Sequence, residues 1–335
     1  MAKEIVTVGG GSGSPTVNEA LLRTKKVDYI KAIAAVFDTG GATGRRRLDS
    51  RGQEIAYSDA MRILLSLIDP NEIDKKYKVI KRWFSHRDAK DTVLGQDIFN
   101  RFFEQSNGFS KIEEDLGLLG INLKGRVIPS TTYSTNIEFI TSSGRRHIGE
   151  HLLDGKIMSK DTVIDMVLNP KVPAYPQAEE AIKNSEVIFI SCGSPHGSVF
   201  CNFLPDGMKE AMEKSKAKKF LITNLVSTRN ETHGFTPRDY VEMAKKYTGV
   251  AIDALIVPEM TRKEFENKHK DVAILYDYEH AHFLGWEQKE LYEVQKDGVD
   301  IVMHKAVKII DIKEENTKIV RHDPVKLAET LSSIL

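Results

Sequence analysis

A glycine-rich segment at residues 9–13 (GGGSG) follows the apolar run at residues 5–8. Glycine lets backbone N–H groups approach a phosphate closely, and a helix that begins after such a segment adds a favourable dipole. The segment lacks the dinucleotide fingerprint, because Ser14 stands where the last glycine is needed, and it lacks the Gly-Lys-Ser/Thr of a P-loop. We therefore predict an anion-binding turn of neither kind, with tight packing as the alternative explanation for the glycines.

Charged residues make up much of a second loop, at residues 38–47 (DTGGATGRRR), which follows the apolar run at residues 32–37. Loops that leave the carboxyl ends of adjacent parallel strands face one crevice, so we expect this loop and the first to line the same wall. The Asp38 carboxylate could hold a ribose hydroxyl or a metal ion, while Arg45 or Arg47 could bind phosphate oxygens through two hydrogen bonds. A solvated basic turn is the alternative.

Small polar residues follow another predicted strand, at residues 191–198 (SCGSPHGS). Glycines and small hydroxyl residues between a strand and a helix are typical of a second anion cradle. Cys192 and His196 could be read as nucleophile and base, but they lie on one turn with no organising geometry. We therefore interpret Cys192 as a small buried residue.

A long polar loop at residues 223–236 (TNLVSTRNETHGFT) leaves the end of a further predicted strand. Long loops inside compact α/β proteins usually carry function. In this loop Asn224 and Thr232 could recognise the edge of a base or sugar, and Glu231 could bind a metal ion. These residue types complement the two candidate anion cradles, so a phosphorylated small molecule is the expected ligand.

The elements that must position these loops alternate between short apolar runs and helical segments. Continuous apolarity at residues 5–8 and 32–37 indicates strands that are covered on both faces, as in a parallel sheet. The alternation resumes after Pro176, with predicted strands at residues 187–191 and 220–224. The sequence therefore predicts a Rossmann-like, doubly wound α/β fold with a mainly parallel sheet.

A middle stretch at residues 70–150 departs from this alternation. Aromatic and aliphatic residues at helical spacing predict helices at residues 73–84 and 93–103. The β-branched, Thr-rich run at residues 127–140 predicts a hairpin closed by Gly144. We therefore expect a helical and β-hairpin insertion within a single composite α/β domain that spans the chain.

The last third of the chain carries the remaining predicted elements. Its pattern predicts a helix at residues 203–214 and strands near Val272, Ile301 and Val307. A closing helix is expected from Pro324, because proline is favoured at the first helical position.

The composition narrows the classes of function. Of the 335 residues 41% are hydrophobic, and 48 Lys and Arg balance 48 Asp and Glu. A formal net charge of +0 disfavours a sequence-blind polyanion binder, so we expect no nucleic-acid partner. The two cysteines fit neither a disulfide framework nor a zinc spacing, and the first residues lack the basic start of a secretory signal. We therefore expect a cytoplasmic protein with no membrane segment.

Motifs spread along nearly the whole chain share their order with one protein family. They read VGGGSGSPT, DTGGATGRRR, DAMRILLSL, CGSPHGSVFCNFLP, TNLVSTRNETHGFTPRDY and HDPVKLAE. In this order the chain resembles the CofD-like proteins, and among them the YvcK-like gluconeogenesis-factor branch. The resemblance implies a Rossmann-like fold that binds a nucleotide, a nucleotide sugar or the deazaflavin precursor that accepts 2-phospholactate.

Two functions follow from this resemblance. The first is a nucleotide- or nucleotide-sugar-binding regulator of carbon metabolism or cell-envelope growth. The second is a transferase like the 2-phospho-L-lactate enzyme, in which Mg²⁺ held by Asp38 and Glu231 neutralises a pyrophosphate leaving group, with Arg45 assisting. The tripeptide at residues 39–41 resembles the regulator's D-x-GG more than the transferase's T-G-D-D, which favours the binding protein. Whether the chain is an enzyme stays open, as does a homodimer.

By motif position, the resemblance also implies the ligand-binding residues. Asp38 is the principal expected metal ligand among them, with Glu231 as the second in the transferase mechanism, and Asp38 and Arg45 are the candidate catalytic residues. The full set is Gly10, Gly11, Ser12, Gly13, Asp38, Gly40, Gly41, Arg45, Gly193, Ser194, Ser198, Asn202, Asn224, Glu231 and Thr232.

Overall fold

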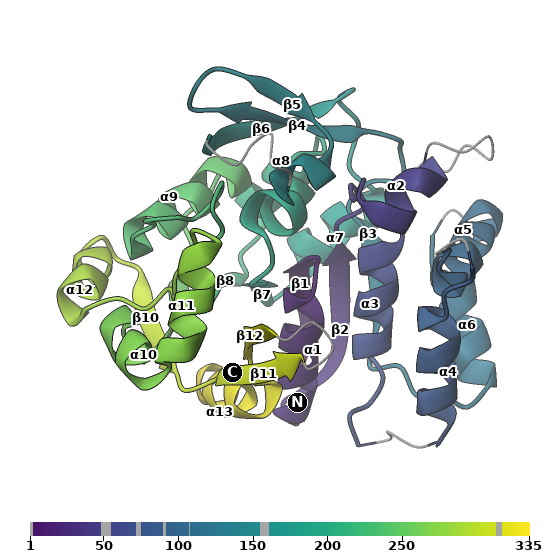
Figure 1. Ribbon diagram of the computed structural model, residues 1–335. Helices are drawn as coiled ribbons and strands as arrows, with labels where there is room; N and C mark the ends of the chain where they lie inside the picture. Colours follow the sequence, from purple (N-terminus) through teal and green to yellow (C-terminus); the bar gives the residue numbers. More distant parts are fainter. Residues whose placement is uncertain are drawn as a thin grey trace.

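A seven-stranded sheet forms the centre of the molecule (Figure 1). The computed structural model describes residues 3–47, 55–71, 75–89, 92–106, 108–154, 161–312 and 317–335. The strand order is β10-β9-β8-β7-β1-β2-β3, and every neighbouring pair is parallel. The strands are β1 (Lys3–Gly9), β2 (Val27–Ala34), β3 (Gly125–Pro129), β7 (Val187–Ile190), β8 (Lys218–Ile222), β9 (Ala254–Pro258) and β10 (Asp300–His304).

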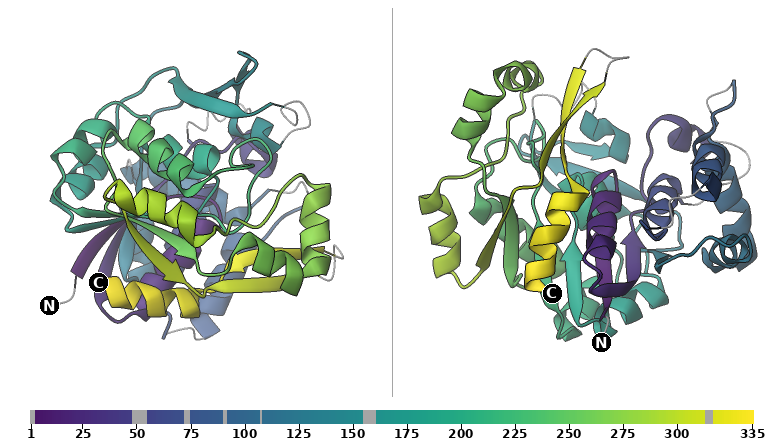
Figure 2. Two further views of the ribbon diagram at one scale, coloured as in Figure 1. Left: turned by 90° about the vertical axis from the view of Figure 1, so that its left-hand side faces the viewer. Right: turned by 90° about the horizontal axis from the view of Figure 1, so that it is seen from below.

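The strand order reverses at β1, which lies between β2 and β7. Crossovers between parallel strands are right-handed. The helices that serve the β2 side of the sheet and those that serve the β7 side therefore cover opposite faces. One set is α1 (Gly13–Arg23), α3 (Ser58–Ser66) and α13 (Pro324–Ile334), in which α1 contacts both of the others. The other set is α7 (Pro176–Asn184), α8 (Met208–Lys214), α9 (Pro237–Thr248) and α12 (Gln288–Lys296) (Figure 2).

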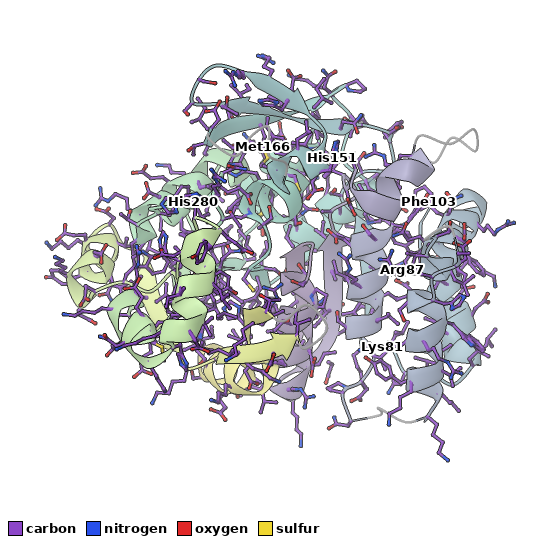
Figure 3. All side chains as sticks on the ribbon, viewed as in Figure 1. Lys81, Arg87, Phe103, His151, Met166 and His280 are labelled. Carbon is purple, nitrogen blue, oxygen red and sulfur yellow. The ribbon has the colours of Figure 1, made fainter. Side chains whose placement is uncertain are left out.

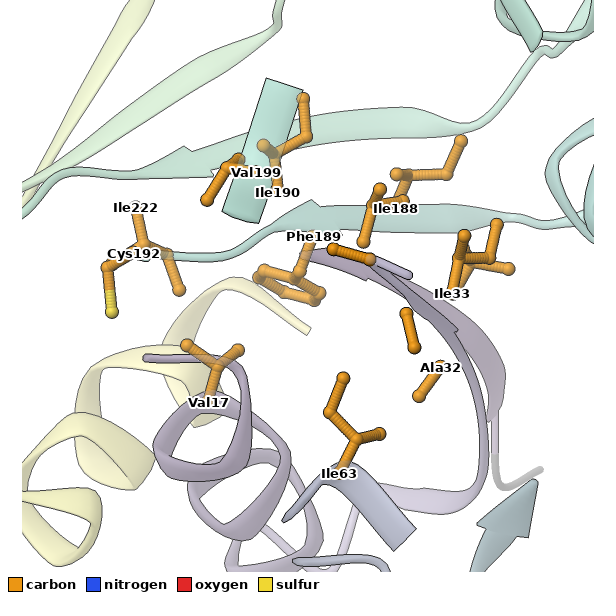
Figure 4. Packing of buried hydrophobic residues seen from close by; sticks show 14 of the residues in the cluster. Val17, Ala32, Ile33, Ile63, Ile188, Phe189, Ile190, Cys192, Val199 and Ile222 are labelled. Carbon is orange, nitrogen blue, oxygen red and sulfur yellow. The ribbon is translucent and has the colours of Figure 1, made fainter. Parts of the chain in front are cut away.

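Helices cover both faces of the sheet, which explains why the strands are continuously apolar. All four residues of β7 and all five of β9 are buried. Figure 4 shows Val17 of α1 and Ile63 of α3 converging with Phe189 of β7 on one part of this core. The predicted doubly wound α/β fold is thereby confirmed.

A bundle of helices is inserted between α3 and β3. Its core is aromatic: Phe99 contacts Phe84 and Phe109 at ring-centroid distances of 5.9 and 5.1 Å. Phe109 also contacts Tyr57 at 6.1 Å, which joins the bundle to the segment before α3. The helices are α4 (Lys75–Ser85), α5 (Leu94–Ser106) and α6 (Ser110–Leu118).

A small antiparallel sheet lies at the top of the view in Figure 1. Its hairpin turns at Gly144, whose φ of +80° favours glycine. The predicted helical addition is present, but the hairpin is formed by residues 136–148 and not by the whole predicted run at residues 127–140. However, β3 separates them and belongs to the central sheet. The strands are β4 (Asn136–Thr141), β5 (Arg146–Ile148) and β6 (Val163–Asn169), and the 3₁₀ helix η1 (Glu150–Asp154) follows β5.

Three other predicted elements differ from the structure. Strand β2 ends at Ala34, several residues before the predicted end at residue 37. The helix predicted at residues 203–214 is divided, because Pro205 follows a 3₁₀ turn and α8 begins only at Met208. The strand predicted near Val272 is wrong, since this residue lies in a helix. The 3₁₀ turn is η3 (Phe200–Phe203), and the helix that contains Val272 is α11 (Lys270–Tyr278); the short helical turn η2 (Pro195–Val199) precedes η3.

The remaining elements lie near the carboxyl edge of the sheet or in the C-terminal part of the chain. They are α2 (Gly41–Arg47), α10 (Arg262–Lys268) and the antiparallel hairpin β11 (Val307–Ile312) and β12 (Thr317–His322). Among the described residues, no helix combines the length and apolarity that crossing a membrane requires.

Candidate functional site

A cavity of about 660 Å³ opens beside the point where the strand order reverses; we call it the switch-point cavity. Its wall combines the turn after β1, the loop after β7 and the loop after β8, and residues from α11 and β12 complete it. Ligands of open α/β sheets bind at such a reversal. Of the predicted site residues, the wall includes Gly11, Ser12, Gly13, Gly193, Ser194, Ser198, Asn224 and Glu231.

Two glycines of the first turn are required by close packing. A methyl group at Gly13 would lie 2.3 Å from the carbonyl oxygen of Cys192, and one at Gly10 would lie 2.2 Å from Oδ2 of Asp59. A third, Gly11, has φ of +63°, a conformation that favours glycine. The turn is thus held tightly between the loop after β7 and α3, and α1 begins at its end.

Glu231 joins the loops that follow β7 and β8. Its carboxylate accepts hydrogen bonds from Ser194 Oγ at 2.8 Å, His196 N at 2.8 Å and Thr228 Oγ1 at 3.0 Å. The Nδ1 atom of His196 lies 3.3 Å from Oε1 of Glu231. Burial raises the pKa of Glu231, but the hydrogen bonds from His196 and Ser194 outweigh burial, so the pKa lies below its usual value. The carboxylate therefore fixes the shape of the cavity wall.

Three other predicted site residues also hold the loops in place. Nδ2 of Asn224 donates to the carbonyl oxygen of Gly193 at 2.7 Å. Thr232 is buried and accepts a hydrogen bond from the backbone of Thr228 at 2.9 Å, behind the wall. Asn202 is fully buried and donates from Nδ2 to the carbonyl oxygen of Ser198 at 2.9 Å.

Asp38 lies at the same edge of the sheet but does not line the switch-point cavity. The Ala35 N–H donates to the Gly9 carbonyl at 3.1 Å, so both loops leave the sheet side by side. The Asp38 carboxylate accepts hydrogen bonds from Gly40 N at 2.7 Å and from Ser58 Oγ at 2.6 Å. Gly40 and Gly41 are likewise outside the cavity wall, and the side chain of Arg45 is outside the described residues.

The loop after Asp38 is anchored instead to residues that flank the strands of the small sheet. Thr39 Oγ1 lies 2.8 Å from Nδ1 of His151 and accepts a hydrogen bond from the backbone of His151. Arg47 donates to the carbonyl oxygen of Thr135 at 2.6 Å. Burial lowers the pKa of Arg47, and the neighbouring Asp38 opposes this shift. Figure 3 labels His151 below the three-stranded sheet and close to α2.

Sequence reasoning missed Asp59, which lies beside the turn at residues 9–13 but is not among the residues that line the switch-point cavity. This buried carboxylate accepts a hydrogen bond from Arg62 at 3.1 Å and interacts with the backbone N–H of Gly11. Burial raises the pKa of Asp59, and the nearby negative charge of Asp38 adds to the shift, although Arg62 opposes it. The available signal was an acidic residue in the first turn of what proves to be α3, with arginine three residues later.

Sequence analysis also did not predict the two arginines that line the cavity. Arg229, from the loop after β8, and Arg321, from β12, both line the switch-point cavity. Neither has an ion pair within the part of the chain that the structure describes. Glu279 lines the cavity as well and is exposed. Arg321 gave no sequence signal, because only the folded hairpin brings it beside loops more than a hundred residues earlier.

Cys192 is buried in the cavity wall, as the sequence analysis expected. Burial raises the pKa of the Cys192 thiol to about 12. Its Sγ lies 3.4 Å from Nδ1 of His322, and burial likewise lowers the pKa of His322 well below its usual value. Both groups are therefore neutral at pH 7, which disfavours nucleophilic catalysis by this thiol.

The carboxylates of the protein could hold Mg²⁺ only together with oxygen atoms of a bound ligand. Within the described residues, no cluster of three or more His, Cys, Asp or Glu could hold a metal ion. Asp38 and Asp59 are neighbouring carboxylates, whereas the oxygens of Glu231 already accept hydrogen bonds from the protein. Mg²⁺ is often held by one or two carboxylates together with substrate phosphates and water.

Comparisons with known proteins agree with this architecture. The family described as "2-phospho-L-lactate transferase CofD" matches residues 5–307. A "Putative gluconeogenesis factor" of Thermotoga maritima is 28% identical over 333 residues, which cover 99% of both chains. A "Gluconeogenesis factor" of Listeria innocua is 27% identical over 346 residues, covering 100% of this chain and 98% of that protein. The crystal structure of protein BH3568 from Bacillus halodurans has the same fold, with a TM-score of 0.80 at 24% identity over 99% of both chains.

Proposed function

The chain belongs to the CofD family, and we propose that it binds a nucleotide or nucleotide sugar in the switch-point cavity. On this proposal it acts, like the gluconeogenesis factors, as a regulator of carbon metabolism or cell-envelope growth. The observation that carries the proposal is the convergence of two glycine-containing turns and two arginines on one cavity at the strand reversal.

The polar groups of the cavity suit a phosphorylated ligand. Helix α1 begins at Gly13, and the N–H groups of a helix's first turn have no carbonyl partner within the helix. Arg229 and Arg321 supply two positive charges at the same cavity. Backbone N–H groups would bind phosphate oxygens on one side, and the guanidinium groups would do so on the other. The cavity's volume of about 660 Å³ lies within the range usual for small-molecule sites.

The same residues favour binding over chemistry in this cavity. The Cys192 thiol is protonated at pH 7, and Glu231 accepts hydrogen bonds from three protein donors. Neither is poised as a nucleophile or general base. Glu231 instead keeps the loops after β7 and β8 in register, so the cavity is preformed.

A Mg²⁺-dependent transferase is the second candidate, and the neighbouring carboxylates Asp38 and Asp59 support it. Bound there, Mg²⁺ would neutralise the charge of a pyrophosphate leaving group. The substrate would then be a deazaflavin precursor, the acceptor of 2-phospholactate that the resemblance of the motifs implies. Ser58 and Gly40 would orient the Asp38 carboxylate through the hydrogen bonds described above.

A thermal-shift screen distinguishes the two candidate functions by the ligand that each one requires. The panel comprises UDP-sugars, free nucleotides and a deazaflavin precursor, each with Mg²⁺ and with EDTA. A ligand at 100 times its Kd adds about 2.7 kcal/mol to the free energy of unfolding, which is readily measured. We expect a UDP-sugar or nucleotide to stabilise the protein. Stabilisation by the deazaflavin precursor alone would favour the transferase.

A further inference from the structure

A second cavity, of about 650 Å³, lies beyond the carboxyl ends of β9 and β10. We call it the lysine-rimmed cavity, because Lys268, Lys305 and Lys326 are among its lining residues. They come from the end of α10, the turn after β10 and the first turn of α13. Apolar side chains, from Met260, Val307 and Ile309, also line it. The cavity thus combines an apolar surface with a cationic rim.

His304, at the end of β10, presents a buried hydrogen-bond donor at this cavity. Its Nδ1 accepts a hydrogen bond from the backbone N–H of Ala306 at 3.1 Å, so Nδ1 carries no proton. Burial lowers the pKa of His304 to about 4, so the ring is neutral at pH 7 and its proton lies on Nε2. Nε2 is buried and has no hydrogen-bond partner within the described part of the chain.

An unpaired buried donor is unfavourable, and a ligand that supplies an acceptor would remove the penalty. His304 lines the cavity but is only 1% exposed, so side chains of the cavity wall must shift before a bound molecule can accept a hydrogen bond from Nε2. The unpaired Nε2–H of His304 therefore predicts a ligand that carries an acceptor oxygen in addition to an apolar surface.

The charges around the cavity favour an anion. Lys305 lies 3.7 Å from Glu259, which is a weak, exposed pair. Glu264 accepts hydrogen bonds from the N–H and hydroxyl of Thr261 at the start of α10. Lys268 and Lys326 have no ion pair within the described residues. Two cations therefore remain for a bound anion.

We propose that the lysine-rimmed cavity is a second ligand site, which takes a small molecule with an apolar body and a carboxylate or phosphate group. The anionic group lies between Lys268 and Lys326 and accepts a hydrogen bond from Nε2 of His304, and the body packs on Val307 and Ile309. This site is separate from the switch-point cavity and does not depend on what that cavity binds.

A pair of histidines lies between the two cavities. His322 lines the switch-point cavity, His304 lines the lysine-rimmed cavity, and their ring centroids are 5.0 Å apart. His322 also contacts Cys192 in the wall of the first cavity. A ligand that fixes the His304 ring therefore has a direct route of contact to the first site.

Calorimetric titration tests the proposal with three naphthalene probes. The anions are 1-naphthyl phosphate and 1-naphthoate, which distinguish the two anionic groups, and 1-naphthylmethanol is the neutral match. We expect at least one anion to bind with 1:1 stoichiometry and at least about tenfold more tightly than the alcohol. Equal affinity for the alcohol, or no saturable binding of either anion at millimolar concentration, would overturn the proposal.

Paired variants locate the binding. Lys268→Ala/Lys326→Ala should weaken anion binding at least about tenfold, since it removes both unpaired cations. The matched control, Lys216→Ala/Lys289→Ala, removes two exposed lysines outside both cavities and should leave affinity unchanged. Unchanged binding in the first pair, or an equal loss in the control, would contradict the assignment. Loss in Arg229→Ala would place the anion in the switch-point cavity instead.

Nitrogen-15 NMR of the histidine rings provides a readout that is independent of these variants. Without probe, His304 should show a neutral ring with its proton on Nε2. The anionic probe should shift that Nε2–H resonance, and the alcohol should shift it less. His304→Gln, whose amide keeps a donor, should retain more affinity than His304→Leu. A His304 resonance that stays unchanged at saturation would exclude the proposed hydrogen bond.

Discussion

Replacing Glu231 should separate the loss of its charge from the loss of its hydrogen bonds. In Glu231→Gln, the remaining oxygen can still accept from His196 N, and the amide can donate to the hydroxyls of Ser194 and Thr228, which rotate. The main loss is charge assistance, so the free energy of unfolding should fall by about 2 kcal/mol. Glu231→Ala leaves all three donors buried without that acceptor and should cost roughly 4 kcal/mol.

The pH dependence gives this prediction a second test. The pKa of Glu231 is lower in the folded protein than its usual value of 4.5. Its contribution to stability is therefore complete above that value and is lost as the pH falls through the lower folded pKa. Urea unfolding of wild type and Glu231→Gln, measured from pH 7 into the acid range, should show a stability difference that shrinks with acidification.

One control variant and two possible outcomes test whether the Glu231 carboxylate holds the loops together. Glu279→Gln alters an exposed glutamate of the same cavity and should change stability little. If Glu231→Ala costs less than about 1 kcal/mol, the carboxylate does not hold the loops together. If Gln and Ala cost equally, the hydrogen bonds to the individual donors do not matter and the reasoning is wrong.

Three further predictions concern other residues near the site. Gly13→Ala should strongly destabilise the protein in thermal unfolding, because its methyl group would lie 2.3 Å from the carbonyl oxygen of Cys192. The control Gly117→Ala places its methyl group in open space on a helix and should raise the free energy of unfolding by up to about 1 kcal/mol. Asp59→Asn should raise the free energy of unfolding at pH 7, because the folded pKa of Asp59 is raised; the gain should vanish below the usual value of 3.8. Asp38→Asn should abolish any Mg²⁺-dependent transfer in a product assay with EDTA controls, and persistent turnover in EDTA would rule out the metal mechanism.

The sequence was most informative where local chemistry decides the structure. Continuous apolar runs identified several strands of the parallel sheet, such as β7, because both faces of that strand are covered. Glycines after a strand located the turn at residues 9–13, and the structure shows that close packing requires them at positions 10 and 13. Tight packing therefore accounts for these two glycines, and anion binding by the turn, which is also one of the cavity walls, stays a prediction.

Long-range contacts decided what the sequence left out. Glu231 meets Ser194 across a separation of 37 residues, and Cys192 meets His322 across 130. No local pattern reports such pairs, so the role of Glu231 as an anchor was not predictable. The wrong strand near Val272 has a different cause: a β-branched run normally indicates burial, but Ile274 is 58% exposed on α11.

Calorimetric titration of a UDP-sugar into wild type and Arg229→Ala/Arg321→Ala tests the central claim most directly. Each charge-assisted hydrogen bond lost is expected to contribute about 1.5–3 kcal/mol, so the double variant should bind at least tenfold more weakly with unchanged unfolding. The matched control, Arg82→Ala/Arg101→Ala, removes two exposed arginines of the helical insertion and should bind like wild type. Equal affinity in all three proteins, or no binding of any UDP-sugar or nucleotide to wild type, would contradict the assignment of the switch-point cavity.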